Sequence, residues 1–227
     1  MYKQPKAFGQ GIFFVISNYI YWFALTNIYF ILCNLIFLIA FMTLEPVFSN
    51  MILIFIALIP TGPAITALCF VMDKLIQEGE ISPTKDFFYG YKLNFKDTLK
   101  VWLPLLAAIF ILIMDLQYFY QENTTFNQIM AIVFLVGLGF LIGVLLYVFP
   151  ITAKYKFRIR DTYKLSIYFS FKQIKITTGN IGILIIAVFL MFITTDFLFL
   201  FIASILSYLL TLNSRKVMEE VQINYTK

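Results

Sequence analysis

The sequence predicts an all-α membrane protein: a polytopic helical bundle of six transmembrane helices, with amphipathic interfacial helices on the cytoplasmic side. The composition is 61% hydrophobic and 13% charged, with a mean hydropathy of +0.88, which leaves too little polar surface for a water-soluble domain of 227 residues. The apolar runs reach the roughly 20 residues that a helix needs to cross a bilayer, and they lack the strict alternation of transmembrane strands. We therefore expect one membrane domain over residues 1–227.

The first two apolar runs predict two spans. Residues 1–17 form a short basic entry along the membrane surface, and the first span covers residues 19–42, with Trp22 as an interfacial anchor. The second span covers residues 47–72. Its Pro-Thr-Gly-Pro sequence at 60–63 predicts a break, because proline removes a backbone donor and clashes one turn back.

A polar segment over residues 74–97 predicts an interfacial helix rather than another crossing. Ser82 can cap a helix and Pro83 suits its first position, so this helix should begin there. The third span then covers residues 98–120 and the fourth covers residues 126–149. We expect the fourth helix to end at Pro150, followed by a second and strongly basic interfacial segment over residues 153–175.

The last apolar block, residues 181–210, has two interpretations: one long tilted helix, or two helices that turn at Asp196. The distribution of charge favours two, with spans over residues 176–194 and 197–213. All 17 Lys and Arg residues then lie on one side of the membrane, and the other side holds only acids, namely Glu45, Asp115, Glu122 and Asp196. By the positive-inside rule, both termini are cytoplasmic.

The sequence offers little for catalysis. It contains no histidine, the commonest general base and a common metal ligand. Cys33 and Cys69 both lie inside apolar runs, where a free cysteine behaves as a small hydrophobe. We therefore expect no enzyme, no catalytic residues, no metal and no cofactor.

Three short motifs resemble a known family. They are Asn34-Leu35 in the first span, the break Ile59-Pro60-Thr61-Gly62-Pro63-Ala64, and Asp86-Phe87-Phe88 followed by Asn94-Phe95-Lys96. Together they resemble the YesL-like family (domain of unknown function 624) of bacterial integral membrane proteins, over residues 16–217. The resemblance implies a multi-pass protein of the bacterial plasma membrane without an established activity. It also implies an accessory role in carbohydrate uptake or envelope biology, since such proteins tend to occur beside genes for sugar uptake and polysaccharide degradation.

The broken second span is the candidate binding site. A proline followed by a basic segment with a Phe-Lys pair occurs after the second and again after the fourth span, and such repeats point to substrate sites in transporters. The alternative is that these prolines only end helices at the interface, and that the polar side chains hydrogen bond between helices. The candidate binding residues are Asn34, Pro60, Thr61, Gly62, Pro63 and Thr66.

The basic segment after the fourth span is the candidate docking site for a partner or for anionic lipid headgroups; its residues are Lys154, Lys156, Arg158, Arg160 and Lys164. Nucleic acid is not an expected partner, because the positive-inside rule already accounts for this basic excess. Two functions remain: an accessory or regulatory protein that binds a membrane transporter, and a small-solute transporter or channel. A polar cavity that reaches Pro60–Thr66 would favour transport, whereas a packed interior would favour partner binding.

Overall fold

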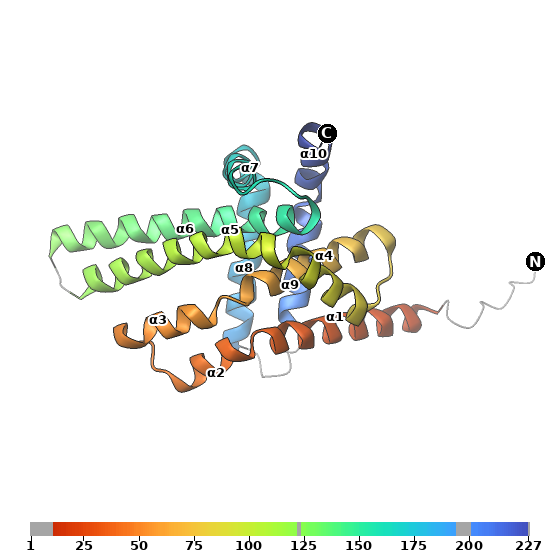
Figure 1. Ribbon diagram of the computed structural model, residues 1–227, viewed down its shortest axis with the longest axis horizontal. Helices are drawn as coiled ribbons and strands as arrows, with labels where there is room; N and C mark the ends of the chain where they lie inside the picture. The colour runs from red at the N-terminus through yellow and green to blue at the C-terminus, as the bar shows by residue number, and fades with distance from the viewer. Residues whose placement is uncertain (1–10, 122–123, 194–200, 227) are drawn as a thin grey trace, which may run out of the picture.

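The protein is an assembly of α-helices, described by a computed structural model over residues 11–121, 124–193 and 201–226 (Figure 1). Within these residues every regular element is an α-helix, which confirms the predicted all-α class. The helices are α1 (Ile12–Cys33), α2 (Leu35–Thr43), α3 (Phe48–Ala57), α4 (Thr61–Glu78), α5 (Pro83–Tyr120), α6 (Thr125–Lys154), α7 (Ile159–Lys172), α8 (Ile174–Ile193), α9 (Ile202–Asn213) and α10 (Arg215–Tyr225).

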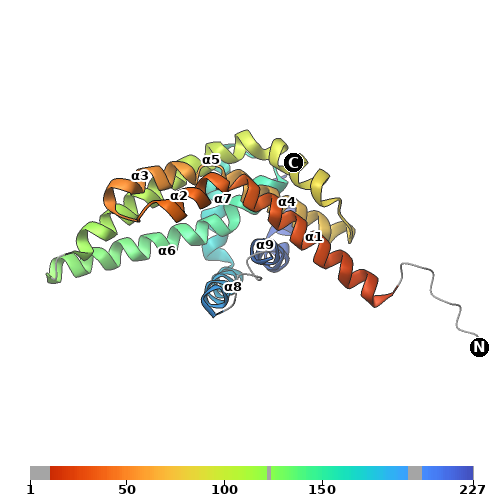
Figure 2. The ribbon, with the colours of Figure 1, turned by 90° about the horizontal axis from the view of Figure 1, so that it is seen from below.

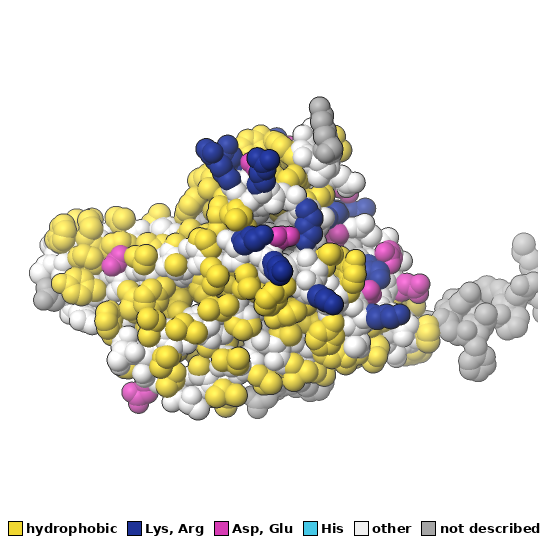
Figure 3. All heavy atoms as spheres, viewed as in Figure 1, with side chains coloured by type: hydrophobic (Ala, Val, Ile, Leu, Met, Phe, Trp, Pro, Cys, Tyr) yellow, Lys and Arg dark blue, Asp and Glu magenta, His cyan; other side chains and the backbone are white. Residues whose placement is uncertain are grey.

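The membrane character is confirmed, but the number of spans differs from the prediction. In the described part of the chain, four helices are long and apolar enough to cross a bilayer, namely α1, α5, α6 and α8, and the bent pair α3–α4 makes a fifth. The predicted sixth span is seen only as α9, whose 12 residues extend about 18 Å, against a hydrocarbon core of roughly 30 Å. Six spans therefore exceed what the described helices provide. Large apolar side chains cover much of the surface (Figure 3).

Two predictions at the ends of the apolar runs fall on residues that the structure does not describe. The predicted turn at Asp196 lies within 194–200, outside the described residues. Most of the predicted basic entry, including Lys3 and Lys6, lies within residues 1–10 and is likewise outside them.

The predicted break in the second span is present. Helix α3 ends at Ala57, α4 begins at Thr61, and the two are bent by 41°. The indole Nε1 of Trp102 in α5 donates a hydrogen bond to the carbonyl of Leu58 at 3.1 Å, so α5 packs directly against the bend. The first predicted span is also interrupted, since α1 and α2 meet at Asn34, whose amide donates to the carbonyl of Phe30 instead of pointing outward.

Two expectations about helix ends are wrong. Helix α5 begins at Pro83 as predicted, but it continues without a break to Tyr120, so the interfacial part and the third span form one helix of 38 residues. Helix α6 likewise continues through Pro150 to Lys154. The turn around Pro150 is held by packing, because Phe149 and Ile151 on either side are buried, and this contact outweighs one lost hydrogen bond.

Helix α4 lies at the centre of the fold. It contacts α1, α5, α6 and α9, and ten of its 18 residues are buried. Helices α5 and α6 lie side by side, while α8 and α9 run across them and are seen nearly end-on in Figure 2. The α2–α3 pair and the paired part of α5 and α6 extend to the left in Figure 1, away from the C-terminal helix α10.

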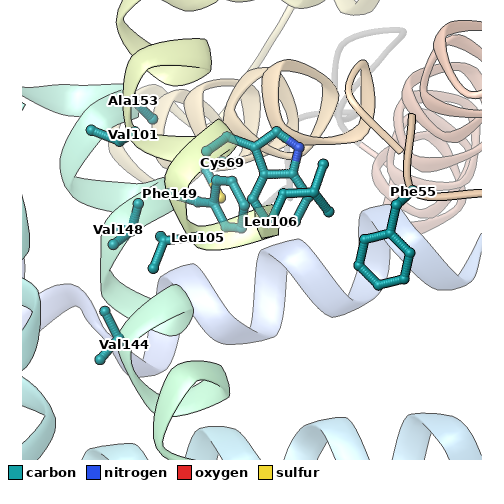
Figure 4. Packing of buried hydrophobic residues seen from close by; sticks show 10 residues of the cluster. Phe55, Cys69, Val101, Leu105, Leu106, Val144, Val148, Phe149 and Ala153 are labelled. Atoms are coloured by element: carbon teal, nitrogen blue, oxygen red, sulfur yellow. The ribbon is translucent and has the colours of Figure 1, made fainter. Parts of the chain in front are cut away.

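The largest apolar cluster joins α3, α4, α5 and α6 (Figure 4). Phe55, Cys69 and Trp102 are members from the first three helices, and the ring of Trp102 lies 5.6 Å from that of Phe149 in α6. A second cluster packs α7 against α10, through residues such as Phe169 and Val217. Helix α10 was not predicted; its apolar positions are too few to stand out from a polar tail.

The contact between α4 and α5 predicts a strong effect of one methyl group. A Cβ added to Gly62 would lie 2.4 Å from the Trp102 ring, so Gly62→Ala should lower the free energy of unfolding by about 1–3 kcal/mol. The measurement is thermal unfolding of the full chain in detergent. Gly139→Ala is the matched control, because a Cβ there meets nothing within 4 Å and alanine favours the helix. Equal melting temperatures for the two variants would contradict the packing described.

Candidate functional site

The described cations gather at one end of the molecule (Figure 3), which we call the basic end. It is formed by the end of α4, the first half of α5, the end of α6, α7 with the segment that precedes it, the start of α8, and α10. Its cations are Lys74, Lys85, Lys92, Lys96, Lys100, Lys154, Lys156, Arg158, Arg160, Lys164, Lys172, Lys175, Arg215 and Lys216. The α2–α3 turn at the far end carries the acid Glu45. The charge asymmetry expected from the sequence is therefore present across the described residues.

The candidate binding residues at the break lie close together, but they pack against one another and do not line a cavity among those described. The Thr61 hydroxyl donates to Asn34 Oδ1 at 2.5 Å, and the Thr66 hydroxyl donates to the carbonyl of Gly62 at 3.2 Å. Asn34, Gly62, Pro63 and Thr66 are buried, while Pro60 and Thr61 are half-buried. Their polar groups are thus satisfied within the protein. Ligand binding at this break stays a prediction.

The candidate docking residues divide into two groups. Lys154 and Lys156 are engaged internally: Lys154 Nζ lies 3.1 Å from Asp73 Oδ2, and Lys156 Nζ lies 2.7 Å from Asn94 Oδ1 and 3.2 Å from Asp97 Oδ2. Arg158, Arg160 and Lys164 are exposed at the start of α7, and they form no ion pair within the described part of the chain. Only this second group is free to contact another molecule; its three residues are Arg158, Arg160 and Lys164.

A polar cavity of about 530 Å³ lies at the basic end, where α4, α5, α6, α9 and α10 meet. The residues whose polar groups line it are Asp73, Lys74, Gln77, Glu78, Asp86, Lys154, Lys156 and Thr211. Two ion pairs between elements cross its wall: Lys154 with Asp73, and Lys74 with Asp86 at 2.7 Å. None of the candidate binding residues of the break lines this cavity.

A smaller cavity of about 200 Å³ lies next to the polar cavity. It shares four residues with it, which are Asp73, Gln77, Lys154 and Thr211. Asp73 accepts hydrogen bonds from Gln77 and from Lys154, so these side chains form a polar wall between the two cavities. Gln77, Asp86 and Thr211 were not predicted as site residues, although Asp86 belongs to a motif of the family resemblance. The spacing of Asp73 and Gln77 on one helical face was the signal available.

Helices α7 and α10 are fixed to the rest of the basic end by polar contacts. Burial raises the pKa of the Tyr155 phenol to about 12, so this group stays protonated and donates to the carbonyl of Met218 at 2.8 Å. A hydrogen bond to Glu220 in α10 raises the pKa of Lys172 in α7. The surface presented by α7 is therefore held in place rather than loosely attached.

Among the described residues no group of three His, Cys, Asp or Glu side chains is arranged to hold a metal ion. What the site offers chemically is a set of hydrogen-bond donors and acceptors around a cavity, next to an exposed basic helix.

Residues 23–116 match the family described as "Protein of unknown function, DUF624". The predicted family resemblance is confirmed for this segment. The matched segment is shorter than the resemblance, which covers residues 16–217. It contains the cavity-lining residues of α4 and α5, whereas those of α6, α9 and α10 lie outside it. No curated protein and no solved structure matches the chain.

Two ion pairs of the basic end predict unequal losses of stability when their acids are replaced, because one is nearly buried and the other is exposed. Asp86 accepts hydrogen bonds from Lys74 Nζ at 2.7 Å and from the Ser82 backbone N–H at 2.8 Å, and its side chain is only 12% exposed. Asp86→Ala should therefore lower the free energy of unfolding by about 1–3 kcal/mol. Glu219→Gln removes half of an exposed pair with Arg215 and should change it by less than about 0.5 kcal/mol. Thermal unfolding in detergent compares the two; a larger loss for Glu219→Gln would refute this assignment.

Proposed function

We propose that this chain is an accessory or regulatory protein of the bacterial plasma membrane that binds a transporter partner through α7, in carbohydrate uptake or envelope biology. The carbohydrate context comes from the resemblance to the DUF624 family. The proposed orientation places the basic end and both termini in the cytoplasm, in accordance with the positive-inside rule.

The observation that supports docking is the exposed face of α7. Arg158, Arg160 and Lys164 are not consumed by ion pairs, and the large apolar side chains of Ile167 and Phe171 on the same helix are 40% and 65% exposed. A helix that combines free cations with exposed apolar groups suits the membrane interface and an acidic partner surface there. Anionic lipid headgroups are attracted by the same charges.

A small-solute transporter is the second candidate function. It is favoured by the polar cavity, which follows α4 inward as far as Cys69. Against it, the residues of the break are packed and hydrogen bonded to one another instead of lining that cavity. We therefore place partner binding first.

Co-purification after mild crosslinking in native membranes tests docking. The variant Arg158→Gln/Arg160→Gln/Lys164→Gln should lose most of the crosslinked partner, because it removes the unpaired cations of α7 without breaking an ion pair. The control Lys85→Gln/Lys92→Gln/Lys96→Gln removes equal charge from exposed positions on α5 and should retain the partner. If the wild-type protein is recovered alone, and reconstituted vesicles take up a sugar, the accessory function is wrong and transport is supported.

The proposed orientation predicts the position of two reporters. An enzyme reporter fused after Lys227 should be active in the cytoplasm, because every cation of the chain is assigned to that side. A second reporter inserted after Glu45, in the α2–α3 turn, should be active only outside. Activity of the C-terminal fusion on the outside would overturn the orientation.

A further inference from the structure

The polar cavity has the size and position of a binding site for a small molecule. Its volume of about 530 Å³ falls within the 300–1,000 Å³ that is usual for ligand sites. Five helices contribute to it, and its charged residues belong to the basic end rather than to the apolar hairpins. A solute from the aqueous phase can therefore reach it without entering lipid.

Thr211 is the residue that indicates an occupant. It is only 4% exposed, and its hydroxyl has no hydrogen-bond partner within the described part of the chain. Other buried helical threonines, such as Thr26 and Thr152, donate to the carbonyl four residues earlier. The Thr211 hydroxyl departs from this pattern, and the residue Thr211 lines both the polar cavity and its smaller neighbour. A buried hydroxyl without a partner is unfavourable unless a molecule in the cavity supplies one.

The charges around the cavity indicate what kind of molecule fits. Lys154 pairs with Asp73 and Lys74 pairs with Asp86, so the closest cations and acids neutralise each other. No excess charge is left to bind an ion strongly. Hydrogen-bonding capacity remains instead, since an ammonium group has three donors, a carboxylate accepts several bonds, and Gln77 adds an amide.

The remaining wall of the cavity is partly aromatic. Phe70 and Tyr89 both line it, with ring centroids 5.8 Å apart. A ligand with apolar C–H faces and several hydroxyl groups satisfies both the rings and the polar wall. We propose that the polar cavity binds a small neutral polyhydroxylated molecule, with Thr211, Asp73, Gln77 and Lys154 as its hydrogen-bonding residues. This site belongs to the chain itself and does not rest on partner docking.

Ligand-observed saturation-transfer NMR on the full chain in detergent tests the site, with D-glucose and D-sorbitol as probes and with glycine and inorganic phosphate as the charged alternatives. We expect saturable binding of at least one polyhydroxylated probe, and weaker or no binding of the other two. Thr211→Val keeps the shape of the side chain and should weaken binding about five- to tenfold, which corresponds to the loss of one hydrogen bond. Its melting temperature should not fall, because no bond within the protein is lost.

Ser166→Ala is the matched control. Ser166 is fully buried and its hydroxyl also lacks a partner in the described residues, but it does not line the polar cavity, so binding should be unchanged. If Thr211→Val does not fold, Gln77→Ala at an exposed position should weaken binding instead. The proposal is overturned by the absence of saturable binding, by preferential binding of glycine or phosphate, or by an equal loss in Ser166→Ala.

Discussion

Polar groups in the apolar part of this molecule are stabilised by hydrogen bonds to partners inside the protein, and several of these bonds join one helix to another. Asn27 of α1 accepts hydrogen bonds from the backbone N–H groups of Ala203 and Ser204, so the start of α9 is held against α1. Asn180 of α8 donates to the Ser214 hydroxyl that follows α9. Lipid competes with apolar side chains for apolar contact, so such bonds give the helix crossings a specificity that hydrophobic packing alone does not supply.

The helices and the Pro60 break were predictable because their causes are local. Composition over about 20 residues determines whether a segment suits the bilayer, and a proline acts within one turn. The continuity of α5 and of α6 was not predictable in the same way. The passage of α6 through Pro150 depends on burial of Phe149 and Ile151 by other helices, and no pattern within the segment reports on those neighbours.

The basic end shows the same division between local and distant causes. The positions of the cations along the chain predicted that they gather on one side of the bundle, as the described ones do. These positions did not show which of the five docking candidates are free to contact another molecule. The structure separates them, because Lys154 meets Asp73 from a helix 81 residues earlier and Lys156 meets Asp97 from α5. Pairings between distant elements depend on tertiary geometry. The sequence alone therefore does not show that Lys154 and Lys156 are engaged in ion pairs, or that Arg158, Arg160 and Lys164 are not.

The Pro60 break and the polar cavity are connected through the direction of α4. The bend of 41° redirects a helix of 18 residues, and without it the far end of α4 would lie roughly 19 Å from its present position. That displacement is about twice the usual distance between packed helices, so Asp73 and Gln77 would leave the cavity wall entirely. The hydrogen bond between Thr61 and Asn34 and the contact of Gly62 with Trp102 hold the bend in place. The motif that carries the family resemblance therefore acts at a distance, by aiming the polar end of α4 at the site where α5, α6, α9 and α10 meet.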